Sequence, residues 1–165
     1  HSDKKFFEYL ILDTFQAGLS WQTIINKREN FRKAFDNFNY KKIAGYGKKD
    51  VKRLMQDVGI IRNKLKIKSA VSNAQKFLEI QNEFGSFDKY IWQFVDSKTI
   101  KNKFRLLNNI PIYTKEAESM SKDMKDKGFN FVGPTICYAF MQGVGMVNDH
   151  TIDCFRYARV GSSKN

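Results

Sequence analysis

The stretch at residues 54–68 reads LMQDVGIIRNKLKIK, and it decides how the chain folds. Apolar residues at helical spacing lead into it over residues 49–57 and continue after it over residues 63–84. Between these segments lies a turn around Gly59, which lets the backbone reverse direction within a few residues. The stretch therefore predicts two helices joined by a tight hairpin.

The chemistry of this hairpin favours an anionic ligand. We expect the amide N–H groups around Gly59 and Ile60 to point outward beside a helix N-terminus, a combination that binds anions. Basic and amide side chains follow directly, namely Arg62, Asn63, Lys64, Lys66 and Lys68. This is the pattern of a helix-hairpin-helix module, which holds the DNA phosphate backbone without reading bases. The alternative interpretation is an ordinary helix–helix turn with a solvated basic face.

Outward from the hairpin, the sequence predicts further helices. Helical patterns cover residues 3–15, 21–35, 40–44, 86–95, 115–127 and 134–147. Asp3, Ser20 and Thr114 are placed to cap three of these helices at their N-termini. We find no convincing strand alternation, no internal repeat and no low-complexity segment. The predicted fold class is therefore all-α.

Composition indicates one folded, basic domain. The chain has 165 residues, of which 42% are hydrophobic, so we assign residues 1–165 to a single domain with the helix-hairpin-helix unit at about residues 49–80. Lys and Arg number 29 against 17 Asp and Glu, which gives a net charge of +12. That charge favours a polyanionic partner, nucleic acid before membrane, with a generic solubility charge as the alternative. No stretch approaches the roughly 18 apolar residues of a membrane span.

The two cysteines, Cys137 and Cys154, are too few for a disulfide scaffold, and no secretory signal is present. We therefore expect the protein in the reducing cytoplasm. Separately, we expect it to be a monomer. His150 and Cys154 are four residues apart, which puts two metal-capable side chains on one face if the segment is helical. A structural zinc site needs four ligands, and the only other histidine is His1. From the residues alone, a capped histidine beside a buried cysteine is the favoured interpretation.

A second stretch, residues 13–22 (DTFQAGLSWQ), combines an acid, a flexible turn and a tryptophan. Trp21 would form a stacking wall for a cationic base, since a cation over an aromatic face gains roughly 0.5–2 kcal/mol. Asp13 would accept a hydrogen bond from an exocyclic amine. Gly18 and Leu19 would approach the duplex and fill the gap left by a flipped nucleotide. The alternative is a helix end with a core tryptophan and a capping aspartate, and for Trp21 alone this alternative is favoured. For Asp13 the two interpretations are closer, because an acid on a largely apolar helix destabilises the fold unless it is paired or has a function.

Several motifs, in order along nearly the whole chain, resemble the 3-methyladenine DNA glycosylase I family. They are residues 7–8 (FE), 16–21 (QAGLSW), 27–30 (KREN), 57–62 (DVGIIR), 66–67 (KI), 128–133 (GFNFVG), 135–138 (TICY), 140–142 (FMQ) and 147–150 (VNDH). Together these motifs are far more specific than any one of them. The resemblance implies the helix-hairpin-helix glycosylase fold, with two lobes around a base pocket. It also implies monofunctional excision of 3-methyladenine from alkylated double-stranded DNA, a hydrolase step of base-excision repair without strand cleavage.

The resemblance also assigns roles to single residues. Trp21 matches the pocket tryptophan of the family. Asp13 stands where the family usually has a glutamate that reads the base, so its reach is shorter by one methylene. Gly18 and Leu19 match the turn that meets the DNA lesion.

The resemblance further implies structural zinc. His150 and Cys154 match the C-terminal half of the family's zinc site, which reverses the interpretation made from the residues alone. The other two ligands, a cysteine and a histidine, lie in an N-terminal segment of the family that we expect to be missing here. His1 resembles the stretch after that segment, so we do not expect it to be the missing ligand.

Two other classes of function stay open. A non-catalytic DNA-binding protein would keep the hairpin but lack a working pocket, and a helical protein–protein module would carry its charge incidentally. Salt-dependent DNA binding would exclude the protein–protein module. Only base release separates an enzyme from a DNA-binding protein. No lysine is clearly placed for a Schiff base, so we expect no lyase step.

Overall fold

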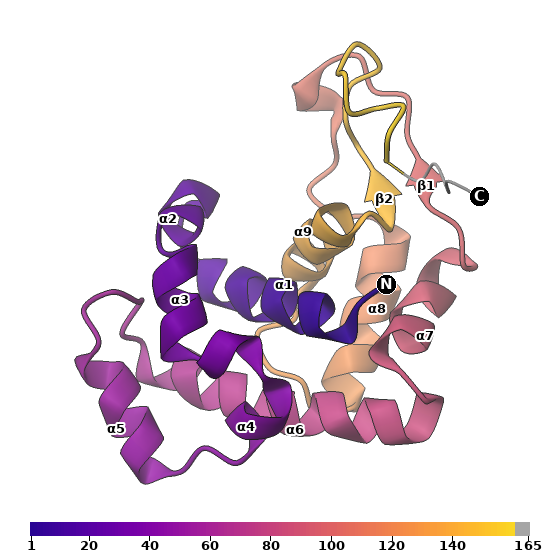
Figure 1. Cartoon of the computed structure of the whole chain (residues 1–165). Coiled ribbons are helices and arrows are strands. Elements are labelled where there is room, and N and C mark those ends of the chain that lie inside the picture. The colour runs from indigo at the N-terminus through magenta and orange to yellow at the C-terminus, as the bar shows by residue number, and fades with distance from the viewer. Residues whose placement is uncertain (161–165) are drawn as a thin grey trace.

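Two helices organise the molecule. In the computed structural model, which describes residues 1–160, α1 (Asp3–Gln16) crosses the centre and the long α6 (Lys64–Phe84) runs beneath it (Figure 1). The side chain of Asn63 caps α6 by accepting the Lys66 N–H at 3.1 Å. Gly85 ends α6 with a φ of +83°, a conformation that favours glycine. Residues 161–165, the end of the predicted domain, lie outside the described residues.

Helices make up most of the described chain. Between α1 and α6 lie α2 (Trp21–Asn26), α3 (Arg28–Ala34), the 3₁₀ helix η1 (Asp36–Phe38), α4 (Tyr40–Ala44) and α5 (Lys48–Gln56). After α6 come α7 (Phe87–Trp92), η2 (Gln93–Val95), η3 (Leu107–Asn109), α8 (Lys115–Asp126) and α9 (Pro134–Val144). The predicted all-α class is confirmed. Every helix within residues 1–160 is too short or too polar to cross a membrane.

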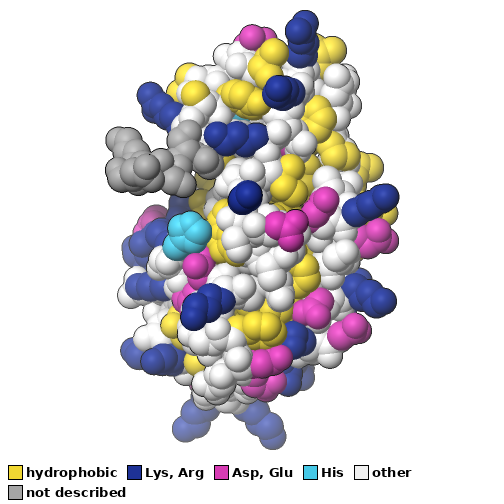
Figure 2. All heavy atoms as spheres, turned by 90° about the vertical axis from the view of Figure 1, so that its right-hand side faces the viewer, with side chains coloured by type: hydrophobic (Ala, Val, Ile, Leu, Met, Phe, Trp, Pro, Cys, Tyr) yellow, Lys and Arg dark blue, Asp and Glu magenta, His cyan; other side chains and the backbone are white. Residues whose placement is uncertain are grey.

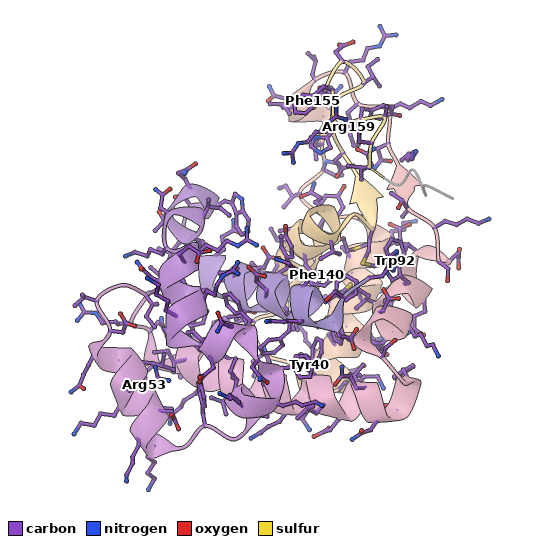
Figure 3. All side chains as sticks on the ribbon, viewed as in Figure 1. Tyr40, Arg53, Trp92, Phe140, Phe155 and Arg159 are labelled. Carbon is purple, nitrogen blue, oxygen red and sulfur yellow. The ribbon has the colours of Figure 1, made fainter. Side chains whose placement is uncertain are left out.

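The interior is built largely from phenylalanine. Phe77 of α6 stacks on Phe87 of α7 with ring centroids 4.1 Å apart and meets Phe7 of α1 edge-on at 5.2 Å. Tyr40 of α4 and Phe140 of α9 approach α1 from opposite sides (Figure 3). Fully burying a side chain of this size stabilises the fold by about 1.5–3 kcal/mol. These contacts fix α1 between α6 and α9.

Two predicted helix boundaries are wrong. The pattern predicts one helix over residues 21–35, but Lys27 has φ −100° and ψ 0° and divides α2 from α3. Its N–H bonds to the Ile24 carbonyl at 3.1 Å, a tight closure that ends α2. The pattern also predicts a helix over residues 134–147, but Gly145 adopts φ +83° and ends α9 early.

The early end of α9 allows a short strand pair that the sequence did not predict. Strand β2 (Val147–Asn148) runs parallel to β1 (Ile100–Lys101), with Ile100 opposite Val147. These strands begin an arm, which we define as residues 100–113 and 146–160, and which stands above α9 in Figure 1. The arm forms one side of the cavity described below.

Helix caps agree with the sequence in two of three places. Ser20 accepts the Thr23 N–H at 3.2 Å, and Thr114 accepts the Ala117 N–H at 3.5 Å. Asp3 does not cap α1. It is the first residue of that helix, and its carboxylate instead accepts the N–H groups of Phe87 and Asp88, at 3.0 and 3.1 Å, so it caps α7.

Positive charge is spread over the surface that Figure 2 shows. Lys and Arg side chains project around the outline of this face, with Asp and Glu side chains among them. A net charge of +12 therefore does not by itself mark a single binding patch on this face. The cavity and the hairpin, rather than the overall charge, locate the functional site.

Candidate active site

A cavity of about 720 Å³ opens between α1, α2, α9 and the arm, within the usual size range for small-molecule sites. The α1 and α2 walls present Tyr9, Asp13, Gln16, Trp21 and Ile25. The α9 and arm walls present Gln142, Gly143, Leu107, Ile110, Asp149, His150, Cys154 and Arg156. The cavity thus brings together Asp13, Trp21, His150 and Cys154, four of the residues predicted from the sequence.

Asp13 is the most unusual group in this cavity. It is 2% exposed, and its Oδ2 is buried without a hydrogen-bond partner among the described residues. Burial raises the pKa of its carboxyl well above the ordinary value. An unpaired buried carboxyl destabilises a fold, so its retention at a cavity indicates a role with a ligand.

Trp21 is the first residue of α2 and lines the same cavity as Asp13. Its exposed fraction is 38%, so the interpretation as a core tryptophan is wrong. The turn before it holds Gly18 at φ +79° and leaves Leu19 exposed. The Leu19 N–H bonds to the Gln16 carbonyl at 2.7 Å, which closes the turn directly after α1. This short turn therefore joins the two cavity walls.

Lys66 fixes the turn from below. Its side chain is only 6% exposed, and its Nζ donates to the carbonyls of Phe15, at 2.9 Å, and of Ala17. These are carbonyls at the end of α1, where helical partners run out and the helix dipole favours a cation. Burial lowers the pKa of Lys66. Lys66 therefore does not join the solvated basic side chains expected after the hairpin.

A polar network supports the opposite wall. Asp149 accepts hydrogen bonds from the Asn102 amide at 2.7 Å, the Gln142 amide at 2.8 Å and the Tyr138 hydroxyl. Burial, together with the bond to Asp149, raises the pKa of Tyr138. Because its NH₂ is turned to Asp149, Gln142 keeps its Oε1 free of any bond to residues 1–160. That oxygen is an acceptor on the wall across from α1.

His150 and Cys154 lie together, but not on a helix. The segment is a series of turns in which the Cys154 N–H bonds to the Thr151 carbonyl at 2.8 Å, and the Cys154 Sγ lies 3.6 Å from the His150 Nδ1. Within residues 1–160, no three His, Cys, Asp or Glu side chains gather as a metal site. His1 contacts Asp88 at 2.8 Å instead. The described residues thus bring together two donors that suit zinc, a thiol and an imidazole, where a structural site needs four.

In the hairpin between α5 and α6, the backbone N–H groups of Gly59 and Ile60 are not free to bind an anion as expected. The Gly59 N–H donates to the Asp57 carboxylate at 2.8 Å, and the Ile60 N–H bonds to the Asp57 carbonyl at 3.4 Å. The prediction that these amides point outward is therefore wrong, and the Ile60 side chain is buried in the core. A Cβ on Gly59 would lie 3.0 Å from the Asp57 Oδ1 and 3.1 Å from the Asn30 Cγ, so this position leaves little room for a side chain.

The side chains after the hairpin are exposed as predicted. Arg62, Asn63 and Lys64 all face solvent at the start of α6. The Asn63 Oδ1 is engaged as the helix cap, which leaves its NH₂ group for other partners. These side chains, rather than the amides of Gly59 and Ile60, are the groups of the hairpin that can meet phosphate.

Sequence reasoning missed several cavity residues. Tyr9 stands one helical turn before Asp13, so helical spacing alone would have placed both on one face. A Cβ on Gly143 would lie 3.0 Å from the Tyr9 ring, so this glycine lets α9 approach α1. Gln142 and Asp149 lay within quoted motifs without an assigned role, and Arg156 carried no signal in the sequence.

Known proteins match nearly the whole chain. The family described as Methyladenine glycosylase matches residues 1–157. DNA-3-methyladenine glycosylase 1 of Escherichia coli is 43% identical over 154 residues, which are 93% of this chain and 82% of that protein. DNA-3-methyladenine glycosylase of Haemophilus influenzae is 42% identical over 151 residues, 92% of this chain and 82% of that protein.

Solved structures give the same result. A crystal structure of 3-methyladenine DNA glycosylase I has a TM-score of 0.90 at 43% identity, covering 93% of this chain and 85% of that one. A structure of 3-methyladenine DNA glycosylase I from Staphylococcus aureus, described in terms of 3-methyladenine recognition, has a TM-score of 0.90 at 33% identity over 93% of this chain and 81% of that one. The fold, the cavity and these matches together show that the chain belongs to the methyladenine glycosylase family.

Proposed function

We propose that this protein is a DNA-3-methyladenine glycosylase, a monofunctional hydrolase that cuts the N-glycosidic bond of 3-methyladenine in alkylated DNA. The observation that carries the proposal is the buried Asp13 carboxyl, whose Oδ2 has no partner among residues 1–160 and which lines the same cavity as the Trp21 ring. An acid beside an aromatic face suits a cationic, planar ligand. The relatives named for this activity support the same conclusion.

The positive charge of the substrate explains how a few cavity side chains can be enough to cleave the glycosidic bond. Methylation at N3 makes adenine cationic, so its glycosidic bond is already weak and the leaving group needs no strong protonation. The pocket has to hold the cation and exclude normal bases. A cation against the Trp21 face gains roughly 0.5–2 kcal/mol. The arriving charge also favours ionised Asp13, which then accepts a hydrogen bond from the exocyclic amine.

Gln142 adds a second acceptor from the opposite wall. Its amide is fixed by Asp149, so its Oε1 is available to a donor in the cavity without reorientation. Neutral adenine carries the same exocyclic amine as 3-methyladenine but no positive charge. Asp13 and Trp21 would therefore favour the methylated base through its charge, whereas Gln142 would accept a hydrogen bond only from a donor that is correctly placed in the cavity. A polar pair on two walls orients a planar base between them.

Water is the expected nucleophile. A lyase step needs an amine at the sugar, yet within residues 1–160 no lysine lines the cavity. The buried Lys66 already donates to two carbonyls. These facts support hydrolysis without strand cleavage.

We propose that DNA binds across the hairpin and the turn. Exposed Arg62, Asn63 and Lys64 would contact phosphates, and the exposed Leu19 beside Gly18 would fill the space that a flipped nucleotide leaves. The sequence-independent charge of the hairpin fits a lesion-searching enzyme, because affinity then does not depend on the bases around the damage. The monomeric state and the cytoplasmic location stay predictions.

Zinc is a separate part of the proposal. His150 and Cys154 would be two of its ligands, as the family resemblance implies. Bound zinc would be structural and would brace the turns of the arm. It would supply no group to the reaction.

The decisive experiment is release of free 3-methyladenine from methylated duplex DNA by this chain, with and without added zinc. Release confirms the enzyme, and a zinc-dependent rate supports the structural metal. Tight, salt-sensitive DNA binding without any base release would contradict the proposal and favour a non-catalytic DNA-binding protein.

A further inference from the structure

Arg156 is a guanidinium on a cavity that otherwise suits a cation. It lines the cavity and is exposed to solvent, so it stands where the cavity meets the surface. The acidic side chains on the same walls are Asp13 and Asp149. Asp149 is already held by three donors, and within residues 1–160 Arg156 forms no ion pair with any carboxylate. Its charge is therefore available to a ligand.

The turn that carries Arg156 is well anchored. The Arg156 carbonyl accepts the N–H groups of Arg159, at 2.9 Å, and of Val160, at 3.2 Å. The buried Asn148 amide donates to the carbonyls of Tyr157 and Val160, at 2.8 and 3.3 Å, and so ties the turn to β2. The Arg156 guanidinium lies 5.8 Å from the centre of the Phe155 ring. The hydrogen bonds fix the backbone of the turn beside the cavity, and the guanidinium extends from that fixed backbone.

A cationic base cannot be the partner of this guanidinium, because like charges repel. An extruded nucleotide also brings its own flanking phosphates to the edge of the pocket. Arginine binds phosphate with two parallel N–H···O bonds, which suits a fixed position. We propose that Arg156 binds a phosphate next to the flipped nucleotide. The inference rests on the proposed function, since it assumes that a nucleotide enters this cavity.

Arg159 offers a matched comparison on the same arm. Its guanidinium lies 5.6 Å from the centre of the same Phe155 ring, and Figure 3 shows Phe155 and Arg159 close together in the upper part of the arm. Arg159 is exposed like Arg156 but does not line the cavity. Removing either guanidinium changes the net charge equally, so any difference between the variants reports position.

The test measures binding of the full chain to a duplex with one tetrahydrofuran abasic site, which keeps the phosphates and lacks the base. We expect Arg156→Ala to weaken this binding about tenfold, as for a charge-assisted contact, and to reduce the slope of log K against log salt by about one. Arg156→Lys should restore the slope but only part of the affinity. Arg159→Ala should weaken binding about twofold or less.

Binding of free 3-methyladenine separates a phosphate contact from a damaged pocket. We expect Arg156→Ala to bind the free base as well as the unaltered protein or more tightly, because a like charge has been removed. Equal losses for the two alanine variants on the abasic duplex, or weaker binding of the free base by Arg156→Ala, would overturn the inference. If Arg156→Ala weakens binding of the abasic duplex as expected but the unaltered protein releases no base, the proposed function is refuted and the phosphate contact is not.

Discussion

At the scale of single residues, the site depends on the Asp13 carboxyl, whose buried Oδ2 has no hydrogen-bond partner among residues 1–160. Asp13 and Trp21 were predicted from the sequence, mostly because their motif resembles a family. Their shared cavity could not be predicted, because its other walls come from α9 and the arm, which lie at least 79 residues away along the chain. Gln142 and Asp149 were missed for another reason, since their roles follow from side-chain hydrogen bonds that only the folded chain makes.

Asp13 makes stability depend on pH. Burial raises its pKa in the folded state above the ordinary value of 3.8, so the folded protein holds the proton more tightly than the unfolded chain. Its favourable contribution is present below pH 3.8 and is lost as the pH rises through the folded-state pKa. We expect the free energy of unfolding of the unaltered protein to fall relative to that of Asp13→Asn over this range.

Urea unfolding from pH 4 to 8 measures the effect. The exposed Asp126→Asn, outside the cavity, serves as the control for removing one carboxyl. A difference between Asp13→Asn and the unaltered protein that does not change with pH would show that Asp13 titrates normally in the folded protein.

Asp13→Glu tests the reach of the acid. The Asp13 carboxyl is recessed in the wall, so one more methylene moves it toward the ligand. We expect free 3-methyladenine to bind about three- to tenfold more tightly, a gain of roughly 0.6–1.4 kcal/mol. Titration of tryptophan fluorescence measures it. Weaker binding would mean that the shorter aspartate is fitted to this cavity.

At the scale of elements, helix existence was predictable and helix ends were less so. Apolar spacing identified α1, α5, α6 and α8 within one or two residues, because each buries a continuous face. The break at Lys27 carries no glycine or proline, so no local signal marks it. Gly145 could have been identified as a C-cap, but the apolar residues that follow it resemble more helix.

Lys66 couples two elements, and its replacement should show that coupling. Lys66→Met keeps the apolar stem but removes the bonds to the end of α1, so we expect about 1–3 kcal/mol of lost stability. The turn at Gly18 and Leu19 would also be less ordered, so base excision at saturating DNA should fall below that of the unaltered protein at temperatures where both are folded. Lys68→Met, on the exposed side of the same helix, should change neither property measurably. Equal melting temperatures and equal excision rates for the two variants would show that Lys66 does not couple α6 to the turn after α1.

At the scale of the whole molecule, affinity and chemistry occupy different places. The hairpin lies between α5 and α6, whereas the cavity is formed by α1, α2, α9 and the arm (Figure 1). We expect the double variant Arg62→Ala, Lys64→Ala to lower the affinity for undamaged duplex at least tenfold and to reduce its salt slope by about two, since two phosphate contacts are lost. Binding of free 3-methyladenine should be unchanged, because neither side chain lines the cavity.

Trp21→Ala should give the converse result. Losing the ring removes the face that stabilises the cation, so free-base binding and base excision should fall about tenfold or more, while affinity for undamaged duplex stays within about twofold. Fluorescence anisotropy with undamaged duplex and single-turnover release of 3-methyladenine measure the two properties in both variants. Matching losses of both properties in Trp21→Ala would mean that the ring supports the DNA-binding surface itself. In that case DNA affinity and base excision would not be properties of two separate sites, the hairpin and the cavity.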